Sequence, residues 1–257
     1  MSRATAEGAA QDVADATAPP SVPPPPRTQT NFDQIADAYD QSLPAHVVEH
    51  YLRKRLAFIQ RYAEPGPTLD LGCGTGLLAE RVADAGYAVV ALDPSRGMLG
   101  HFRQRRPDLP AVTGSGPALP FPDETFALTY CVAVMHHVAE PEAVRQTLAE
   151  MARVTRPGGR VIVWDHNPRN PYWPLLMKRV PQDTGAERLI PEAEIVGGLG
   201  AGGAPLLHAA QLGLVPDFVP RPLLPLAAAV ERAVEAIPGL RRLCAHNVVL
   251  AAKAARP

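Results

Sequence analysis

The sequence predicts an α/β protein with a doubly wound parallel sheet. After the breaker Pro65-Gly66-Pro67, short apolar runs alternate with longer segments of helical periodicity. Alternation of strand and helix produces right-handed crossovers and a parallel sheet covered on both faces. The strands are predicted at 68–71, 88–92, 111–113, 126–132 and 160–164. The helices between them are predicted at 76–86, 95–106 and 141–155.

Two further helices are predicted before the sheet. Apolar residues recur there at helical spacing, as Phe32, Ile35, Ala36 and Tyr39 and then as Val47, Tyr51, Leu52, Leu56 and Ile59. Residues 1–30 are rich in Ala, Thr and Pro, contain the run Pro23 to Pro26, and have almost nothing to bury. The predicted organisation is a disordered Ala/Pro-rich tail at 1–30, a helical segment at 31–66 and an α/β domain at 67–257.

The final third of the chain is less regular. A weak helix is predicted at 192–199, a strand at 214–219 and a buried strand at 246–252. A helix at 223–237 carries its apolar side chains on the face opposite Glu231 and Glu235. Packing on the core is the favoured interpretation of that apolar face, and contact with a membrane surface or a lipid-linked acceptor is the alternative.

Composition excludes several classes of protein. With 25 Lys and Arg against 26 Asp and Glu, the chain has no basic field to hold a nucleic acid. Its three cysteines are far apart and form no C-x-x-C pair, which argues against a disulfide framework or a structural zinc site. The first twenty residues lack the apolar run of a signal peptide, and no later segment suits a membrane span. We therefore expect a cytoplasmic protein without integral membrane association; the oligomeric state stays open.

The sharpest local signal is the loop Gly72-Cys73-Gly74-Thr75-Gly76 after the first strand, where a nucleotide-like ligand approaches the backbone of such a sheet. Leu77 stands where a dinucleotide fingerprint needs its third glycine, and the Lys-Ser or Lys-Thr of a P-loop is absent. Asp70 would repel a pyrophosphate but suits a cationic ligand. Asp93, 17 residues after Gly76, is placed to accept hydrogen bonds from two ribose hydroxyls. An adenosine that carries a positive group fits best.

The sequence resembles the class I S-adenosylmethionine-dependent methyltransferases, in particular the small-molecule enzymes with a Rossmann-like domain. The resemblance is carried by LDLGCGTGLLAERV at 69–82, by ALDPSRGML at 91–99 and by the blocks 119–144 and 150–163. It implies a seven-stranded sheet whose last strand, here 246–252, runs antiparallel, and N-terminal helices that fold over the cofactor as a lid. It also implies methyl transfer from S-adenosyl-L-methionine to a small-molecule acceptor, at oxygen or nitrogen ahead of carbon.

The resemblance assigns roles in cofactor binding as well. Gly72, Gly74 and Gly76 would pass under the methionine end, Asp70 would orient that end, and Asp93 would bind the ribose. The other expected contacts are Tyr39, Cys73, Pro94, Met98, Ser115 and Cys131. Ser115 stands where such enzymes commonly carry an aspartate near the adenine amino group, and Ala127 also replaces a common aspartate. Both departures lower the expected affinity for adenine.

Two histidines are candidate general bases, because His137 follows the fourth strand and His166 follows the fifth at the ligand-binding edge of the sheet. An unperturbed imidazole titrates near pH 6.5 and works close to neutrality. Positioning of the reactants contributes more to methyl transfer than a base does, so activity does not depend on these histidines alone. No metal site is predicted, because adjacent His136 and His137 would point in opposite directions on an extended segment.

Two other functions stay open at this point. A degenerate cofactor-binding module without catalysis is favoured only by Ser115 and Ala127, and an NAD(P)-dependent oxidoreductase is disfavoured by Leu77. Tyr172 and Trp173 lie just beyond the fifth strand among two Asn-Pro steps, and they are expected to wall the acceptor site.

Overall fold

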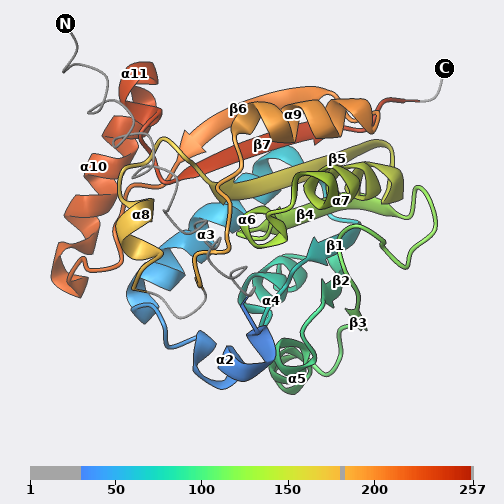
Figure 1. Ribbon diagram of the computed structural model, residues 1–257, viewed down its shortest axis with the longest axis horizontal. Coiled ribbons are helices and arrows are strands. Elements are labelled where there is room, and N and C mark those ends of the chain that lie inside the picture. The colour runs from blue at the N-terminus through green and yellow to red at the C-terminus, as the bar shows by residue number, and fades with distance from the viewer. Residues whose placement is uncertain (1–29, 180–182, 256–257) are drawn as a thin grey trace, which may run out of the picture.

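The computed structural model describes residues 30–179 and 183–255 (Figure 1). The predicted tail at 1–30, with its proline run, therefore lies outside the described residues except for Thr30. Among the described residues, seven strands form one sheet in the order β3-β2-β1-β4-β5-β7-β6. The strands are β1 Pro67–Leu71, β2 Ala88–Asp93, β3 Ala111–Thr113, β4 Phe126–Val132, β5 Thr155–His166, β6 Leu206–Leu212 and β7 His246–Ala252.

Strand directions confirm the predicted sheet. β1 pairs in parallel with β2 and β4, and β2–β3 and β4–β5 are also parallel. β7 runs antiparallel to both of its neighbours, β5 and β6. This is the Rossmann-like arrangement with an antiparallel last strand that the sequence resemblance implies.

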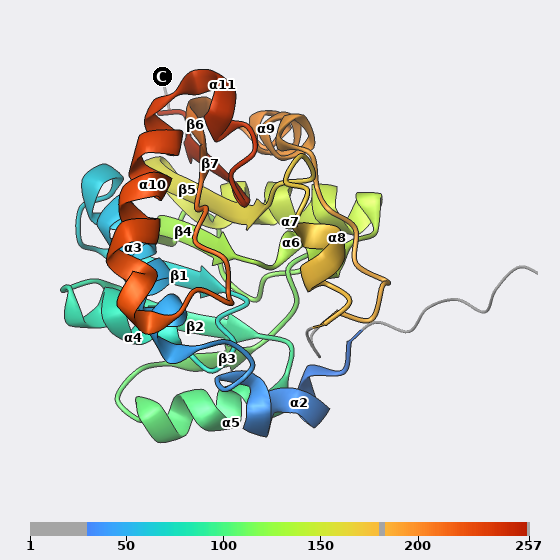
Figure 2. The same cartoon turned by 90° about the vertical axis from the view of Figure 1, so that its left-hand side faces the viewer.

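The helices cover both faces of the sheet. They are α2 Phe32–Tyr39, α3 Ala45–Tyr62, α4 Leu77–Asp84, α5 Arg96–Arg105, α6 Met135–Val138, α7 Pro141–Val154, α8 Trp173–Leu176, α9 Glu192–Ala201, α10 Leu224–Ala236 and α11 Pro238–Arg241, with a 3-10 turn, η2, at Arg221–Leu223. Leu148 of α7 and Leu199 of α9 are buried on one face, and Ile59 of α3 and Val82 of α4 on the other. Figure 2 shows these two helical layers edge on. None of the helices in the described part of the chain is long and apolar enough to cross a membrane.

The predicted strand at 214–219 is wrong. The residues pair with no strand, and the edge strand is instead β6, which ends just before Gly213. Gly213 has a φ of +83° and turns the chain out of the sheet. Val215 and Val219 are buried because they pack against Val47 of α3. Apolar residues that alternate along a segment indicate burial, and here the burial comes from a helix.

The favoured interpretation of the helix at 223–237 is also wrong. Leu226 is 65% exposed and Val230 is 48% exposed, whereas Glu231 is 1% exposed. Glu231 faces inward because it accepts hydrogen bonds from Lys54 Nζ (2.6 Å) and from the backbone N–H of Leu214 (2.6 Å). Ion pairing has therefore decided which face of α10 is buried.

Candidate active site

The glycine loop joins β1 to α4 at the carboxyl edge of the sheet. Gly72 has a φ of +72° and Gly76 a φ of +86°, a region that favours glycine. A Cβ on Gly72 would lie 2.4 Å from Cγ2 of Val134, and one on Gly76 would lie 2.1 Å from Cδ2 of Phe102. Both the backbone conformation and the close packing require glycine at these two positions.

Asp93 connects this loop to the end of β2. Its Oδ2 accepts a hydrogen bond from the backbone N–H of Gly74 (2.8 Å), and its Oδ1 accepts one from that of Ser95 (2.9 Å). Burial raises the pKa of the Asp93 carboxyl, and these two N–H donors lower it in part. Each carboxylate oxygen has a further lone pair. Asp93 also lines a cavity, so those lone pairs are available to hydroxyl donors of a ligand there.

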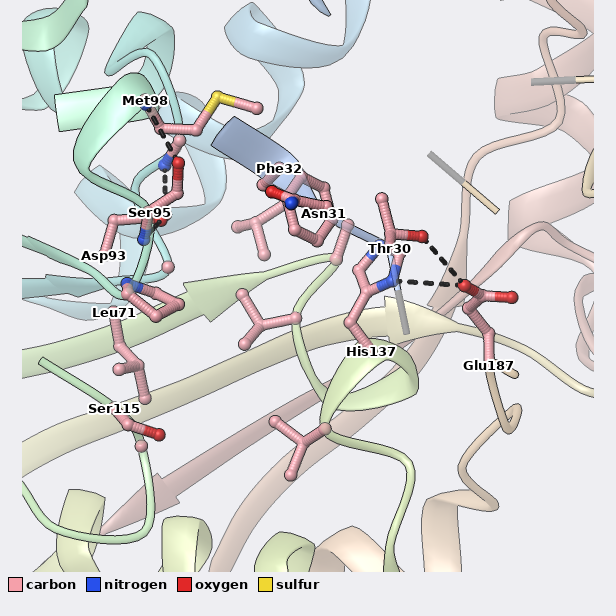
Figure 3. Close-up of a pocket in the computed structure, with 18 of the residues that line it drawn as sticks. Thr30, Asn31, Phe32, Leu71, Asp93, Ser95, Met98, Ser115, His137 and Glu187 are labelled. Atoms are coloured by element: carbon pink, nitrogen blue, oxygen red, sulfur yellow. Dashed lines mark hydrogen bonds and ion pairs between the residues drawn. The ribbon is translucent and has the colours of Figure 1, made fainter. Parts of the chain in front are cut away.

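A first cavity of about 640 Å³ lies above the loop (Figure 3). Seven of the predicted cofactor residues line it, namely Tyr39, Gly72, Gly74, Asp93, Pro94, Met98 and Ser115. Phe32 and Asp33 of α2 close it from the outside. This volume is in the range of sites for small molecules and cofactors.

Helix α2 is held over the first cavity by polar contacts with the ends of α4 and α5. Oδ1 of Asp33 accepts hydrogen bonds from Oγ of Ser95 (2.6 Å) and the N–H of Gly97 (2.7 Å). Asp40 accepts one from Oγ1 of Thr75 (2.5 Å) and pairs with Arg105 (2.8 Å). These contacts place α2 where a lid over the cofactor is expected.

A second cavity of about 260 Å³ adjoins the first. Four loop or strand-end residues line both cavities, as do Tyr39 and His137; the four are Gly72, Gly74, Val132 and Ala133. The glycine loop is therefore the common wall, and a group bound in one cavity can approach a group bound in the other at that point.

Asp70 lies beneath the second cavity, not the first. It is 3% exposed and accepts a hydrogen bond from the hydroxyl of Tyr130 (2.8 Å). Burial raises the pKa of Asp70 to about 7, and the nearby charge of Asp93 adds to the effect. Ionisation of Asp70 is therefore favoured when a cation binds nearby.

Two predicted cofactor residues line neither cavity among the described residues. Cys131 has no exposed surface and packs in the core against the α7 side of the sheet. Gly76 precedes α4 and packs on Phe102. Cys73 lines the second cavity with Asp70. The structure therefore gives Cys131 and Gly76 a place in the packing of the strand and loop and not in the lining of either cavity.

A row of four rings forms one wall of the second cavity. Ring centroids are 4.0 Å apart for His137 and His136, 3.9 Å for His136 and His166, and 3.6 Å for His166 and Trp173. His136 and His137 belong to the short helix α6, so the prediction that they point in opposite directions is wrong.

Potential metal-ligand atoms also cluster there. His136, His137 and Asp183 each place one such atom within 4.8 Å of the others, and so do His136, Asp165 and His166. The geometric argument against a metal site therefore does not hold. The expectation of no metal stays a prediction.

Two imidazoles of this row have a carboxylate partner. Nδ1 of His137 lies 3.9 Å from Oε1 of Glu187, which is too far for a hydrogen bond, whereas the carboxylate partner of His136 lies within hydrogen-bond distance. Nδ1 of His136 lies 2.8 Å from Oδ1 of Asp165, a residue with no exposed surface. Burial would raise the pKa of Asp165, but His136 and the backbone N–H groups of His166 and Met135 outweigh it and lower that pKa. An ionised Asp165 fixes the proton of His136 on Nδ1 and leaves Nε2 as the acceptor. This pair was not predicted from the sequence, although His136 follows β4 and Asp165 lies at the end of the neighbouring strand β5.

The two histidines predicted as bases have different properties from those expected. Burial, reinforced by the neighbouring imidazole of His136, lowers the pKa of His137 to about 3. The same two causes hold the pKa of His166 well below its usual range. The expected titration near pH 6.5 is therefore wrong for both, and they stay neutral at physiological pH.

Several buried polar atoms around the second cavity have no hydrogen-bond partner among the described residues. They are Nε of Arg55, Nδ1 of His166, Nδ1 of His246 and Oδ1 of Asp183. Unsatisfied buried polar atoms are rare in folded proteins and mark places where a ligand supplies the partner.

Of these four side chains, Arg55 is the one that is a permanent cation. Its guanidinium lies over the rings of Tyr51 (5.6 Å) and Trp164 (6.0 Å), and within the described ranges it has no carboxylate partner. Burial lowers the pKa of Arg55. No feature of the sequence singles out this residue, because an arginine in a helix is ordinarily exposed or paired.

Residues 69–163 match the methyltransferase domain family. Over 165 residues the chain is 37% identical to the demethylmenaquinone methyltransferase of Renibacterium salmoninarum. This alignment covers 61% of this chain and 68% of the relative. The chain belongs to the class I S-adenosylmethionine-dependent methyltransferases. The predicted enzyme class, cofactor and fold of this methyltransferase are thereby confirmed, and its acceptor is a small molecule.

Two solved structures share the fold of this methyltransferase. A possible histamine N-methyltransferase from Thermotoga maritima superposes with a TM-score of 0.66 at 19% identity and covers 86% of this chain and 97% of the other. The magnesium protoporphyrin IX methyltransferase of Synechocystis PCC 6803, crystallised with S-adenosylmethionine, gives 0.53 at 16% identity, with 88% and 86% covered. The dinucleotide-dependent alternative has no support in these similarities.

Proposed function

We propose that this methyltransferase holds S-adenosylmethionine in the first cavity and its acceptor in the second. The observation that carries the proposal is the shared wall formed by Gly72, Gly74 and His137. Asp93 holds the ribose hydroxyls and Ser115 lies toward the adenine, while α2 closes over the cofactor as a lid. When bound, the cofactor supplies an electrophilic methyl group on a sulfonium.

The acceptor is methylated at a hydroxyl oxygen or an amine nitrogen. Nε2 of His136 takes the proton from that atom, and Asp165 holds the imidazole in the required tautomer. The neutral rings of His137 and His166 line the acceptor and orient its polar group. The Arg55 guanidinium pairs with an oxygen that is anionic or becomes so.

Turnover by three histidine variants tests the assignment of the base. His136→Gln should lower kcat by roughly 10² to 10⁴ while the Kd for the cofactor changes little. His137→Ala and His166→Ala should each lower kcat less. His101→Gln, at a surface imidazole paired with Asp37, is the control and should leave kcat unchanged.

Near-normal turnover in all three variants, with cofactor binding unchanged, would contradict base catalysis. Catalysis would then rest on positioning alone, with an acceptor that is already deprotonated in solution. Circular dichroism of each variant separates loss of the base from loss of the fold.

The relatives favour one acceptor to test first. The curated relatives are demethylmenaquinone methyltransferases, so reduced demethylmenaquinone belongs in the panel beside phenols and amines. Nuclear magnetic resonance of a product made with labelled cofactor shows whether the methyl group is on oxygen, nitrogen or carbon. Cofactor binding without turnover over the whole panel would favour the non-catalytic alternative.

A further inference from the structure

The C-terminal helices present an unusual apolar surface to solvent. Its residues are Leu175, Phe218, Leu223, Leu226, Val230, Ile237, Leu240 and Leu243, each between 47% and 65% exposed. We call this set the apolar face. It extends over α8, the loop before η2, α10 and α11, which lie on one side of the molecule in Figure 1 and face the viewer in Figure 2. Exposed apolar side chains gathered on neighbouring elements favour an interaction site.

Buried ion pairs hold α10 in the orientation that points the apolar face toward solvent. Glu231 accepts hydrogen bonds from His50 (2.9 Å) and Lys54 (2.6 Å) of α3. Lys54 also pairs with Glu235 (2.5 Å), which in turn accepts the N–H of Gly213 (2.7 Å). Rotation of α10 to bury its leucines would break these ion pairs and hydrogen bonds and would leave the buried charged groups without partners. The orientation of α10 is therefore built into the fold.

The exposed charges from η2 to Arg242 have one sign, and Asp217 of the preceding loop is largely buried and accepts a hydrogen bond from the hydroxyl of Tyr172. Both acidic residues of α10, Glu231 and Glu235, point into the ion-pair network. The remaining charged side chains from η2 to the end of α11 are arginines, of which Arg221, Arg232 and Arg242 are exposed and Arg241 is partly exposed. Leucines flanked by arginines match a layer that is apolar inside and anionic at its surface.

The apolar face adjoins part of the lining of the second cavity. Tyr172 and Asp217 line that cavity, and the ring of Tyr172 contacts the ring of Phe218 with centroids 5.9 Å apart. Leu176 also lines it and is the chain neighbour of the exposed Leu175. A surface seated on the apolar face would therefore lie next to residues that line this cavity.

We propose that the apolar face docks this methyltransferase on the surface of an anionic lipid bilayer. The leucines and Phe218 enter the boundary between headgroups and acyl chains, and the arginines contact the lipid phosphates. Docking places the second cavity next to the bilayer. The proposal does not depend on which residue is the catalytic base.

Sedimentation with vesicles tests the proposal on the full chain without cofactor or acceptor. The chain should bind vesicles of phosphatidylglycerol and phosphatidylcholine, and bind phosphatidylcholine alone at least tenfold more weakly. The triple variant Leu226→Gln, Val230→Gln, Ile237→Gln should lose at least tenfold in binding to the mixed vesicles. Arg241→Gln with Arg242→Gln should reduce both the binding and its dependence on salt.

The matched control is Leu206→Gln with Leu207→Gln, which removes apolar side chains of similar exposure at the start of β6, away from α10 in Figure 1. It should bind vesicles like the unmodified chain, and melting curves should show all variants folded. Absence of vesicle binding, or unchanged binding by the triple variant, overturns the proposal. A dimer in light scattering that the triple variant converts to a monomer, without vesicle binding, would instead make the face an interface between copies.

Discussion

The two cavities of this methyltransferase are built in different ways. The first is built around backbone at the ends of β1 and β2, where Asp93 is tied to the glycine loop through the N–H of Gly74, and α2 packs over it. The second gathers side chains from distant segments, such as Arg55 of α3, His136 of α6 and His246 of β7. Several of its buried polar atoms have no partner in the described residues.

This difference suggests a division of function. A cavity whose geometry is set by backbone conformation suits a cofactor that is the same in every enzyme of the class. A cavity lined by unsatisfied side chains suits a ligand that must supply matching groups, since the wrong ligand leaves those groups unpaired. The following variants test that division, from the largest expected effect to the smallest.

Replacement of Asp93 should have the largest effect on the cofactor. Asp93→Ala removes hydrogen bonds to the ribose, each worth about 1.5–3 kcal/mol when the acceptor is charged, so affinity for S-adenosylmethionine should fall about a hundredfold or more. Calorimetric titration measures the Kd for S-adenosylmethionine in each variant. Asp108→Ala, at an exposed carboxylate paired with Arg106, is the control. Equal affinity in the two variants would remove Asp93 from the cofactor site.

Gly72→Ala should affect both stability and cofactor binding. The positive φ costs about 1–2 kcal/mol, and the contact of the new Cβ with Val134 adds about 1–3 kcal/mol. Gly86→Ala shares a positive φ but meets nothing within 4 Å, so only the first cost applies. Urea unfolding of the two variants separates backbone strain from crowding; equal free energies of unfolding would mean that Val134 gives way freely.

Arg55→Met should affect the acceptor alone. Loss of a charged hydrogen bond to the acceptor oxygen should raise its KM about 10- to 100-fold, while the Kd for S-adenosylmethionine stays the same. Stability should stay equal or rise, because a buried cation without a partner is removed. Arg53→Met, at a more exposed arginine of the same helix, is the control. A matching loss of cofactor affinity would show that the two cavities are not separate sites.

The smallest expected effect is the pH dependence contributed by Asp70. Its pKa of about 7 in the free protein means that the carboxyl becomes charged as pH rises through neutrality. Although Asp70 lines the second cavity, it is close enough to the first to interact with Asp93, so affinity for the sulfonium cofactor should rise by roughly threefold to tenfold from pH 6 to pH 8. Asp70→Asn should abolish that rise. Because the folded pKa is raised above the unfolded value, the free protein should also lose stability from acidic pH up through about pH 7.

Local sequence predicted the parts of the site that depend on local geometry. The loop glycines, Asp70 at the end of β1 and Asp93 at the end of β2 lie in one sheet edge because parallel strands end together. Tyr172 and Trp173 also line the second cavity, since the turns after β5 return the chain to the same edge, and their role in walling the acceptor site stays a prediction. These inferences need only the order of elements and the direction of strands.

Long-range contacts decided the rest. Val215 and Val219 are buried by α3 and not by strand pairing, and α10 turns Glu231 inward because Lys54 and His50 lie opposite. Hydrophobic periodicity predicts which side chains share a face. Which element packs against that face depends on the whole fold.

The sequence by itself determined that this protein is an α/β methyltransferase with a cofactor loop at one sheet edge. Only the tertiary structure decided that His136 has the carboxylate of Asp165, that Arg55 has none among the described residues, and that burial lowers the pKa of His137. The physical reason is that glycine conformation and strand direction are local properties. The protonation and pairing of a buried side chain depend on every charge packed around it, whatever its distance along the chain.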